Sequence, residues 1–368
     1  MLTVVRRRTD VADVFDKVLT GERLTPADGL RLLACNDLAA LGAMANVVRE
    51  RLNGDRTYYV INRHINYSNI CVNACRFCAF SRKRGDAGAY EMGLDEIFRT
   101  AQESLVEPVT EFHIVGGLHP TLPFSFYEDM LRGLKAIAPA VHLQAFTAVE
   151  IAHIAELGGL SVREALERLR EAGLGSIPGG GAEVFSPELR RTLCPTKLPG
   201  DDWLDVMRTA HELGLRSNAT MLYGHVEKPE HVIEHLDRLR ALQDETGGFM
   251  AFIPLMFHVE HTRLGELRPA TGRRDLQVMA VSRVYLDNFP HLKAFWIMLG
   301  VKLAQVSLGF GADDLDGTVV EERITHAAGA RTPQALSVEE LRALIEEAGR
   351  TPVERTTLYE VVEREAHR

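Results

Sequence analysis

Three of the five cysteines in this 368-residue chain lie within eight positions, at Cys71, Cys75 and Cys78. Their spacing is C-x3-C-x2-C, in a segment rich in aromatic and basic side chains. Thiolates grouped in one loop bind soft metals. Structural zinc usually takes four protein ligands, and the common iron–sulfur spacings supply four cysteines. With no fourth cysteine nearby, the pattern predicts a metal centre that keeps one position open for chemistry.

The residues alone leave two other interpretations of this loop open. A histidine such as His64 or His113 would complete a zinc site, and the protein would then be a non-catalytic zinc or iron–sulfur protein. The three cysteines could also be buried and bind nothing. Cys35 and Cys194 stand apart in the sequence and are expected to be ordinary structural residues.

The composition describes a large globular protein with no sign of a polyanionic partner. The chain is 46% hydrophobic and 25% charged, which is enough to bury a sizeable core. A formal net charge of −9 argues against nucleic acid and anionic membrane surfaces as partners. No apolar run approaches ~20 residues, and the N-terminus lacks the pattern of a signal peptide. An odd number of clustered cysteines indicates metal ligation in a reducing compartment, so a cytoplasmic location is expected.

Short apolar runs alternate with amphipathic helices from about Tyr58 onward, which predicts βα units and a parallel sheet. Eight runs are strand candidates: Tyr59–Asn66, Glu111–Val115, Val141–Phe146, Gly175–Pro178, Ser217–Leu222, Phe249–Leu255, Leu292–Leu299 and Ala304–Phe310. Eight repeats predict the α/β class and a (β/α)8 TIM-type barrel. The count depends on the last two runs, and without them the fold would be a six-stranded partial barrel.

Helical segments are expected on both sides of the barrel. The expected division is an N-terminal helical leader over 1–55, a barrel core over 56–318 and a C-terminal helical extension over 319–368. In the leader, Thr25-Pro26 predicts a helix start. In the extension, Ser337-Val-Glu-Glu340 predicts a capping box, and Thr351–Arg368 is expected to be a surface tail.

Active sites of such barrels lie at the C-terminal ends of the strands, and two glycine-rich turns occupy these positions. Gly116-Gly117 ends the second predicted strand, and Pro178-Gly-Gly-Gly181-Ala-Glu183 ends the fourth. Glycines let a ligand approach the backbone, and a carboxylate beside them suits a ribose or a sulfonium group. The alternative is a plain strand-to-helix turn, with Glu183 in solvent.

Polar residues at the third and fifth predicted strands are further candidates. Thr147 and Glu150 are either cofactor contacts or a helix capping box. Asn218 and Thr220 share the strand face that should point into the barrel, which indicates either a ligand or satisfied core hydrogen bonds. His225 follows them and could contact a ligand or donate a proton, although a lone histidine is more often structural.

An acidic run, Asp313-Asp314-Leu-Asp316-Gly317, follows the last predicted strand. It contains half of a calcium-binding loop but lacks the closing Glu. We therefore expect it to order a turn or to contact the substrate.

The cysteine loop resembles that of the radical S-adenosylmethionine (SAM) superfamily. In that superfamily three cysteines hold a [4Fe–4S] cluster, the fourth iron chelates SAM, and a glycine-rich turn contacts the methionine amino group. The resemblance implies that Cys71, Cys75 and Cys78 are the metal ligands. It implies contacts to the cofactor from Phe77, Gly116, Gly117, Thr147, Glu150 and Glu183.

Seven stretches narrow the resemblance to the aminofutalosine synthase family of the futalosine route to menaquinone. They are Asn69-Ile-Cys71, Phe77-Cys-Ala-Phe-Ser-Arg82, Gly116-Gly-Leu-His-Pro120, Ala145-Phe-Thr-Ala-Val-Glu150, Pro178-Gly-Gly-Gly-Ala-Glu183, Asn218-Ala-Thr-Met-Leu-Tyr-Gly-His225 and Gly311-Ala-Asp-Asp-Leu-Asp-Gly-Thr318. The dehypoxanthine futalosine cyclases and the deazaflavin (FO) synthases share the cysteine spacing and much of the barrel, and they remain the alternatives.

This family resemblance implies a transferase that consumes SAM. A 5′-deoxyadenosyl radical from SAM would add to 3-[(1-carboxyvinyl)oxy]benzoate, and rearrangement with loss of a carboxylate would give 6-amino-6-deoxyfutalosine. An electron donor such as flavodoxin or ferredoxin and a homodimer are the expected partners. The expected substrate contacts are Asn218, Thr220, His225 and Arg283. The two substrate carboxylates need cationic or hydrogen-bonding groups, and the sequence does not rank Arg82, Arg283, Lys302 and His225 among them.

Overall fold

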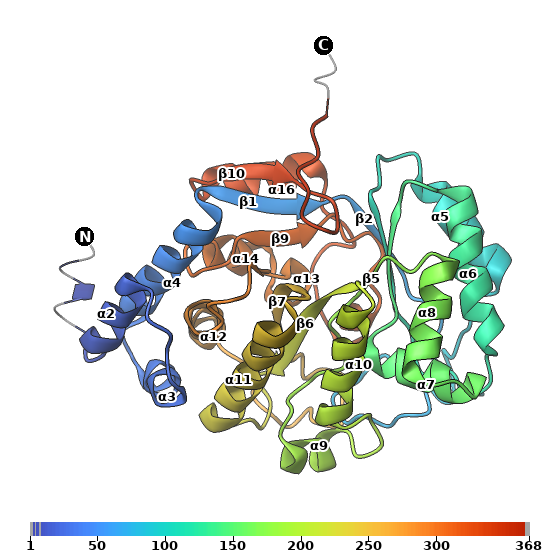
Figure 1. The fold of residues 1–368 in the computed structure, drawn as a ribbon, viewed down its shortest axis with the longest axis horizontal. Coiled ribbons are helices and arrows are strands. Elements are labelled where there is room, and N and C mark those ends of the chain that lie inside the picture. Colours follow the sequence, from blue (N-terminus) through green and yellow to red (C-terminus); the bar gives the residue numbers. More distant parts are fainter. Residues whose placement is uncertain (1–2, 4, 7–8, 365–368) are drawn as a thin grey trace.

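Parallel strands at the centre of the fold are surrounded by helices in the computed structural model, which describes residues 3, 5–6 and 9–364 (Figure 1). The strands are β1 (Arg56–Val60), β2 (Asn62–Ile65), β3 (Glu111–Ile114), β4 (His142–Ala145), β5 (Ser176–Ile177), β6 (Arg216–Tyr223), β7 (Phe249–Met256), β8 (His291–Leu292), β9 (Asp314–Gly317) and β10 (Thr351–Glu354). The helices of the barrel region are α5 (Leu94–Ser104), α6 (Phe124–Ile137), α7 (Ala148–Gly158), α8 (Val162–Ala172), α9 (Pro187–Leu193), α10 (Gly200–Glu212), α11 (Pro229–Thr246), α12 (Gly272–Tyr285), α13 (Trp296–Leu299) and α14 (Val301–Ser307).

The strands form two parallel sheets that join into a curled, barrel-like wall. Strands β2 to β8 form a seven-stranded sheet in sequence order, and β10, β1 and β9 form a second sheet. A parallel bridge between Lys293 and Asp314 links the end of β8 to β9, and Ile61 alone separates β1 from β2. The predicted α/β class with a TIM-type arrangement of parallel strands is therefore confirmed.

The eighth predicted strand was placed in the wrong segment, and the seventh was too long. Residues 304–310 were expected to be a strand, but 301–307 form helix α14, because a short apolar run does not by itself separate a strand from a helix. Of Leu292–Leu299, only the first residue belongs to β8, and α13 begins at Trp296. The eighth strand position is taken by β9, whose sequence Asp-Leu-Asp-Gly has low strand propensity.

The C-terminal segment is also not a surface tail over its described part. Strand β10 pairs in parallel with β1, with Arg56 opposite Thr351 and Tyr59 opposite Glu354. Arg355 follows β10, is fully buried, and places its Nε 2.6 Å from Oδ2 of Asp314. The prediction was wrong because this pairing joins segments about 300 positions apart. Residues 365–368 of the expected tail lie outside the described residues.

The leader is helical, as predicted, and packs on one side of the barrel (Figure 1). Its helices are α2 (Ala12–Thr20), α3 (Pro26–Ala34) and α4 (Leu38–Asn53). Thr25 forms a capping box with Asp28 at the start of α3. Helix α4 packs against α12, and its buried Arg49 donates hydrogen bonds to the carbonyls of Ala312, Gly54 and Arg56.

Helices α15 (Ile324–Ala327) and α16 (Val338–Glu347) follow the barrel. The predicted capping box of Ser337 and Glu340 is present at the start of α16. No helix in the described ranges is both long and apolar enough to cross a membrane.

Candidate active site

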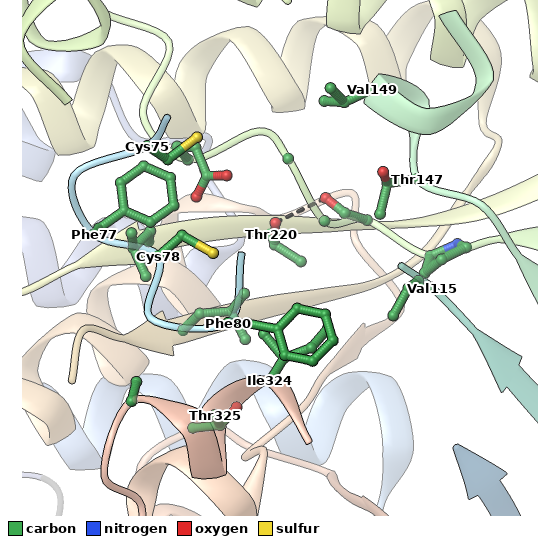
Figure 2. A pocket seen from close by; sticks show the side chains of 18 of the residues that line it. Cys75, Phe77, Cys78, Phe80, Val115, Thr147, Val149, Thr220, Ile324 and Thr325 are labelled. Atoms are coloured by element: carbon green, nitrogen blue, oxygen red, sulfur yellow. Dashed lines mark hydrogen bonds between the residues drawn. The ribbon is translucent and has the colours of Figure 1, made fainter. Parts of the chain in front are cut away.

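A cavity of about 320 Å³ lies at the C-terminal ends of the barrel strands. The cysteine loop, the two glycine-rich turns and side chains from β2, β3, β4, β6, β7 and β9 line it. Figure 2 shows Cys75, Phe77 and Cys78 on one side of this cavity and Thr147 and Val149 on another. Most of the predicted site residues therefore meet in one place, although they lie between Cys71 and Thr220 in the sequence.

The three clustered cysteines are free and all line this cavity. Lys83 supports their loop, because its ammonium donates to the carbonyls of Cys71 and Val72, each at 2.8 Å. Burial raises the pKa of the Cys75 thiol to about 12, and burial also raises the pKa of Cys71. A thiol must lose its proton to bind a metal, so metal binding at such thiols would release protons.

The loop offers sulfur ligands without a fourth cysteine. Cys35 and Cys194 are both buried, and neither lines the cavity. Within the described ranges, no three His, Cys, Asp or Glu side chains are gathered as the ligands of a single metal ion. Three free thiols on one cavity wall fit a cluster that is held by three cysteines.

The Gly116-Gly117 turn packs directly on the segment that leads into the cysteine loop. A Cβ atom at Gly117 would lie 2.4 Å from the carbonyl oxygen of Ile70, and one at Gly116 would lie 2.7 Å from the ring of Tyr67. Both glycines line the cavity. Their lack of a side chain is thus required by packing, whatever ligand the turn contacts.

Glu150 joins this turn to helix α7. Its Oε1 accepts hydrogen bonds from the Gly116 N–H and the Tyr67 hydroxyl, each at 2.9 Å. Its Oε2 accepts from the N–H and the hydroxyl of Thr147, each at 2.8 Å, so the capping box is present. Burial outweighs these bonds and raises the pKa of Glu150. The carboxylate is occupied by protein donors and positions the Gly116 turn.

The second glycine-rich turn carries an ion pair that the sequence did not reveal. Glu183 has a positive φ of 52° and accepts a hydrogen bond from Lys197 at 2.5 Å. The Lys197 ammonium also lies 5.6 Å from the centre of the Phe77 ring. Burial is the largest influence and acts against the charge of Lys197, but the neighbouring Glu183, Cys75 and Cys194 together outweigh it and raise the pKa of Lys197. Glu183 is therefore not a solvated turn residue.

Strand β6 presents its polar face to the cavity, as predicted. Asn218, Thr220 and Leu222 all line it. The Thr220 hydroxyl donates to the carbonyl of Gly179 at 2.7 Å, which is the dashed contact in Figure 2. Asn218 is 2% exposed, and its Oδ1 has no hydrogen-bond partner among the described residues. Thr220 thus serves the core, while Asn218 keeps an acceptor for a ligand.

Two predicted substrate contacts lie elsewhere, and we correct them. The His225 ring bonds the carbonyl of Leu222 at 3.0 Å and the N–H of Val226 at 2.7 Å, and its side chain is fully buried. Arg283 is buried on α12, where it donates to Asp313 and to two carbonyls. Both side chains stabilise the protein, because neighbouring groups already use their hydrogen-bonding atoms.

A polar layer lies within the barrel, and of its members only Asn218 was predicted from the sequence to point inward; we call this layer the cavity floor. It consists of His64, His113, Gln144, Asn218, Lys293 and Asp316, all of which line the cavity. His64, His113 and Gln144 lie at matching positions of β2, β3 and β4. Strand alternation could have found them, since His64 and His113 fall on the same inward face that led to Asn218.

Two family models match the chain. The model of the radical SAM superfamily matches residues 65–239, and the model of the CofH/MqnC C-terminal region matches residues 246–367. Between them they cover most of the barrel and of the C-terminal extension.

Curated relatives match over nearly the whole chain. The chain is 48% identical to the aminodeoxyfutalosine synthase of Thermus thermophilus, with 95% of both chains covered. It is 47% identical to the aminodeoxyfutalosine synthase of Streptomyces coelicolor, with 94% of this chain and 92% of the relative covered. It is 44% identical to a 5-amino-6-(D-ribitylamino)uracil–L-tyrosine 4-hydroxyphenyl transferase of Methanopyrus kandleri, with 86% of this chain and 88% of the relative covered.

Solved structures share the fold at lower identity. A methylornithine synthase superimposes with a TM-score of 0.73 at 20% identity, covering 92% of this chain and 96% of its own. A maturase of the [FeFe]-hydrogenase superimposes with a TM-score of 0.75 at 17% identity, covering 97% of this chain and 79% of its own. At such identities the likeness establishes the arrangement of the strands and helices.

Proposed function

Because the chain belongs to the radical SAM superfamily, as an enzyme that uses a [4Fe–4S] cluster and SAM, we propose that it is an aminodeoxyfutalosine synthase. The reaction joins the 5′-deoxyadenosyl group of SAM to 3-[(1-carboxyvinyl)oxy]benzoate and, with loss of a carboxylate, yields 6-amino-6-deoxyfutalosine. The observation that carries this proposal is 48% identity to such a synthase over 95% of both chains.

Cys71, Cys75 and Cys78 are the proposed ligands of the cluster. Their support is that three free thiols line one cavity wall, with Lys83 holding the carbonyls of their loop. When bound and reduced, the cluster supplies the electron that cleaves SAM to methionine and a 5′-deoxyadenosyl radical. The protein's own task is to hold the two substrates in register and to exclude water and other hydrogen donors.

The proposed SAM contacts lie on the two glycine-rich turns and beside the cysteine loop. Gly116 and Gly117 bring the backbone to the cavity, and Thr147 with Glu150 holds that turn in place. On the other turn, Glu183 offers a carboxylate to the ribose or to the cationic end of SAM. Lys197 orients this carboxylate through their hydrogen bond, and Phe77 lies beneath the ammonium.

The walls between the cysteine loop and the floor suit an aromatic substrate. Apolar side chains among the lining residues include Val115, Leu222, Ile253, Leu255, Phe257 and Phe295. A benzene ring that enters here replaces water against apolar surface, which favours binding. The same walls keep alternative hydrogen donors away from a reactive radical.

A second candidate is 4-hydroxyphenyl transfer from tyrosine to a ribitylaminouracil. The 44% identity to such a transferase over most of both chains favours it. The dehypoxanthine futalosine cyclases are a third possibility, in keeping with the C-terminal region that the chain shares with CofH and MqnC.

One labelling experiment tests the three reactions together. The reconstituted, reduced protein is incubated without oxygen with SAM labelled at the 5′ carbon and with each set of substrates in turn. We expect the label in a product that contains both adenine and the benzoate ring. If the label appeared only in 5′-deoxyadenosine, with dehypoxanthine futalosine or tyrosine consumed, the synthase proposal would be wrong.

A further inference from the structure

The cavity floor contains a cation whose hydrogen-bonding capacity is not used up. Lys293 is 3% exposed, and its ammonium bonds Asp316 at 3.2 Å, its one hydrogen-bond partner among the described residues. An ammonium carries three donors. A buried donor without a partner is costly, so the spare donors of Lys293 indicate a ligand that accepts hydrogen bonds.

His64 adds a second unpaired polar group to the same layer. It is 6% exposed, and its Nε2 has no hydrogen-bond partner among the described residues. Burial and the neighbouring His113 hold the pKa of His64 well below its usual value, so the ring is neutral and one nitrogen carries a hydrogen. His64 and Lys293 both line the cavity. With the hydrogen on Nε2, the ring and the ammonium together offer two donors, which match the two oxygens of a carboxylate.

The orientation of His64 is fixed by its neighbour. The rings of His64 and His113 stack with centroids 4.4 Å apart and an angle of 14°. His113 Nδ1 in turn lies 3.2 Å from Oε1 of Gln144, whose amide donates to Ser176 at 3.1 Å. This chain of contacts runs across four strands and makes His113 a positioning residue for His64.

The other lysine of the described cavity lining is already committed. Lys197 is paired with Glu183 near the cysteine loop, at the end of the cavity where the proposed SAM contacts gather. The two lysines therefore lie at opposite ends of the cavity. Lys293 is surrounded by residues of the strands, whereas Lys197 lies in a loop beyond the strand ends.

We infer that the ring carboxylate of the benzoate substrate binds at the cavity floor, between the Lys293 ammonium and Nε2 of His64. The inference rests on the proposed function. The alkene must face the adenosyl carbon at the cysteine end, and the enolpyruvyl carboxylate is attached to that alkene. The ring carboxylate is meta to the ether oxygen and so points the other way. The apolar walls hold the ring between the two ends.

A cycle of one substitution and one ligand change tests the contact without turnover. Binding of 3-[(1-carboxyvinyl)oxy]benzoate and of 2-phenoxyacrylate, which lacks the ring carboxylate, is measured by calorimetry on the unreduced protein with SAM. We expect the wild type to prefer the first ligand by roughly 10- to 100-fold, as for a charged hydrogen bond. Lys293→Met should bring this ratio close to one, because without the ammonium the ring carboxylate no longer has a cation to pair with. The cycle measures the coupling between these two groups, since their effects on binding are not additive when they are in contact.

Matched variants separate this contact from a loss of fold. Lys302→Met removes an exposed lysine of α14 and should keep the full preference. Lys293→Met with Asp316→Asn avoids leaving an unpaired carboxylate and should behave as Lys293→Met does. His64→Phe keeps a ring to stack on His113 and should lower the preference in part. In each variant, the cluster absorbance and the SAM affinity report that the other end of the cavity is intact.

The outcomes are distinct. If Lys293→Met retained the wild-type preference, or if the wild type showed none, the inference would be wrong while the proposed function stood. If the wild type bound neither ligand, the proposed function would be wrong, and the inference would fall with it.

Discussion

Two buried ion pairs involve aspartates that lie three positions apart on the acidic run, Asp313 and Asp316, and the two pairs have different roles. Arg283 and Asp313 pair at 2.5 Å behind the barrel wall, and every nitrogen of the guanidinium donates to Asp313, Gly311 or Phe289. Asp313 also accepts from His291 at 2.6 Å and from the N–H of Leu292 at 2.8 Å. Lys293 and Asp316 instead line the cavity, and Lys293 has donors to spare.

The difference shows how to separate structural from ligand-binding charges. A buried charge whose partners are all in the protein stabilises one conformation, since any ligand would have to displace them. A buried charge with unused donors is stable only when something else accepts them. The backbone supports the distinction, because Asp316 has a positive φ of 68°, a conformation that is costly for a residue with a side chain.

The largest expected effect concerns the cavity, at the three cysteines of its lining. Cys71→Ala, Cys75→Ala and Cys78→Ala should each abolish the brown iron–sulfur absorbance and all product formation after anaerobic reconstitution, because each removes one of three ligands. Cys35→Ala and Cys194→Ala are the matched controls and should keep both. Wild-type protein that took up stoichiometric zinc and no iron would contradict the proposed ligands.

At the structural end, Arg283→Met should cost about 3–5 kcal/mol of unfolding free energy, because Asp313 loses its guanidinium partner in the core. Chemical denaturation measures this loss. Adding Asp313→Asn should recover part of it. Protein that unfolded as the wild type does but had lost its affinity for the benzoate would restore Arg283 as a substrate contact, as the sequence had predicted.

Asp275, a buried carboxyl group whose partner is a hydroxyl and not a cation, tests through the pH dependence of stability how burial acts on a charge. Asp275 is 3% exposed and accepts a hydrogen bond from Tyr223 at 2.9 Å. Burial raises its pKa to about 6, so the folded protein holds this proton more tightly than the unfolded chain does. Unfolding then releases a proton, and stability falls as pH rises from about 4 to 6.

Asp275→Asn should remove this pH dependence. At pH 7 we expect it to raise the unfolding free energy by up to about 3 kcal/mol, since the amide oxygen still accepts from Tyr223 without a charge. Thermal and chemical denaturation between pH 4 and 8 measure the effect. If the unfolding free energy changed with pH between 4 and 6 in the same way in the variant and the wild type, Asp275 would be ionised in the folded protein over this range.

The smallest expected effect concerns the ion pair beside the cysteine loop. Lys197→Met should weaken SAM binding roughly tenfold, because Glu183 loses the ammonium that orients it, and charged hydrogen bonds contribute at least about 1.5 kcal/mol. Calorimetry on the reconstituted protein measures it, with Lys302→Met as the control. Unchanged SAM affinity in both Lys197→Met and Glu183→Ala would remove this turn from the proposed SAM site.

Local signals identified the segments of the first six predicted strands, the helix starts at Thr25 and Ser337, and the cysteine loop. The first of these segments, Tyr59–Asn66, is divided in the structure between β1 and β2, which belong to different sheets. These features depend on residues a few positions apart, whose period, capping or spacing is visible along the chain. Strands β9 and β10 were missed for the opposite reason. The carboxylates of β9 are stable in a strand because Arg355 pairs with Asp314 and Lys293 pairs with Asp316. Its partner β1 lies more than 250 positions earlier.

The sequence by itself determined the cysteine spacing, the alternation of strands and helices, and the family. It also placed the glycine-rich turns at strand ends, where a barrel collects its functional loops. Only the tertiary structure decided which charged side chain serves which role. It paired Glu183 with Lys197, withdrew His225 and Arg283 into the core, and brought His64 and Lys293 to one floor. The physical reason is that the function of a buried charge depends on its unused hydrogen bonds, and those are known only once its neighbours in space are known.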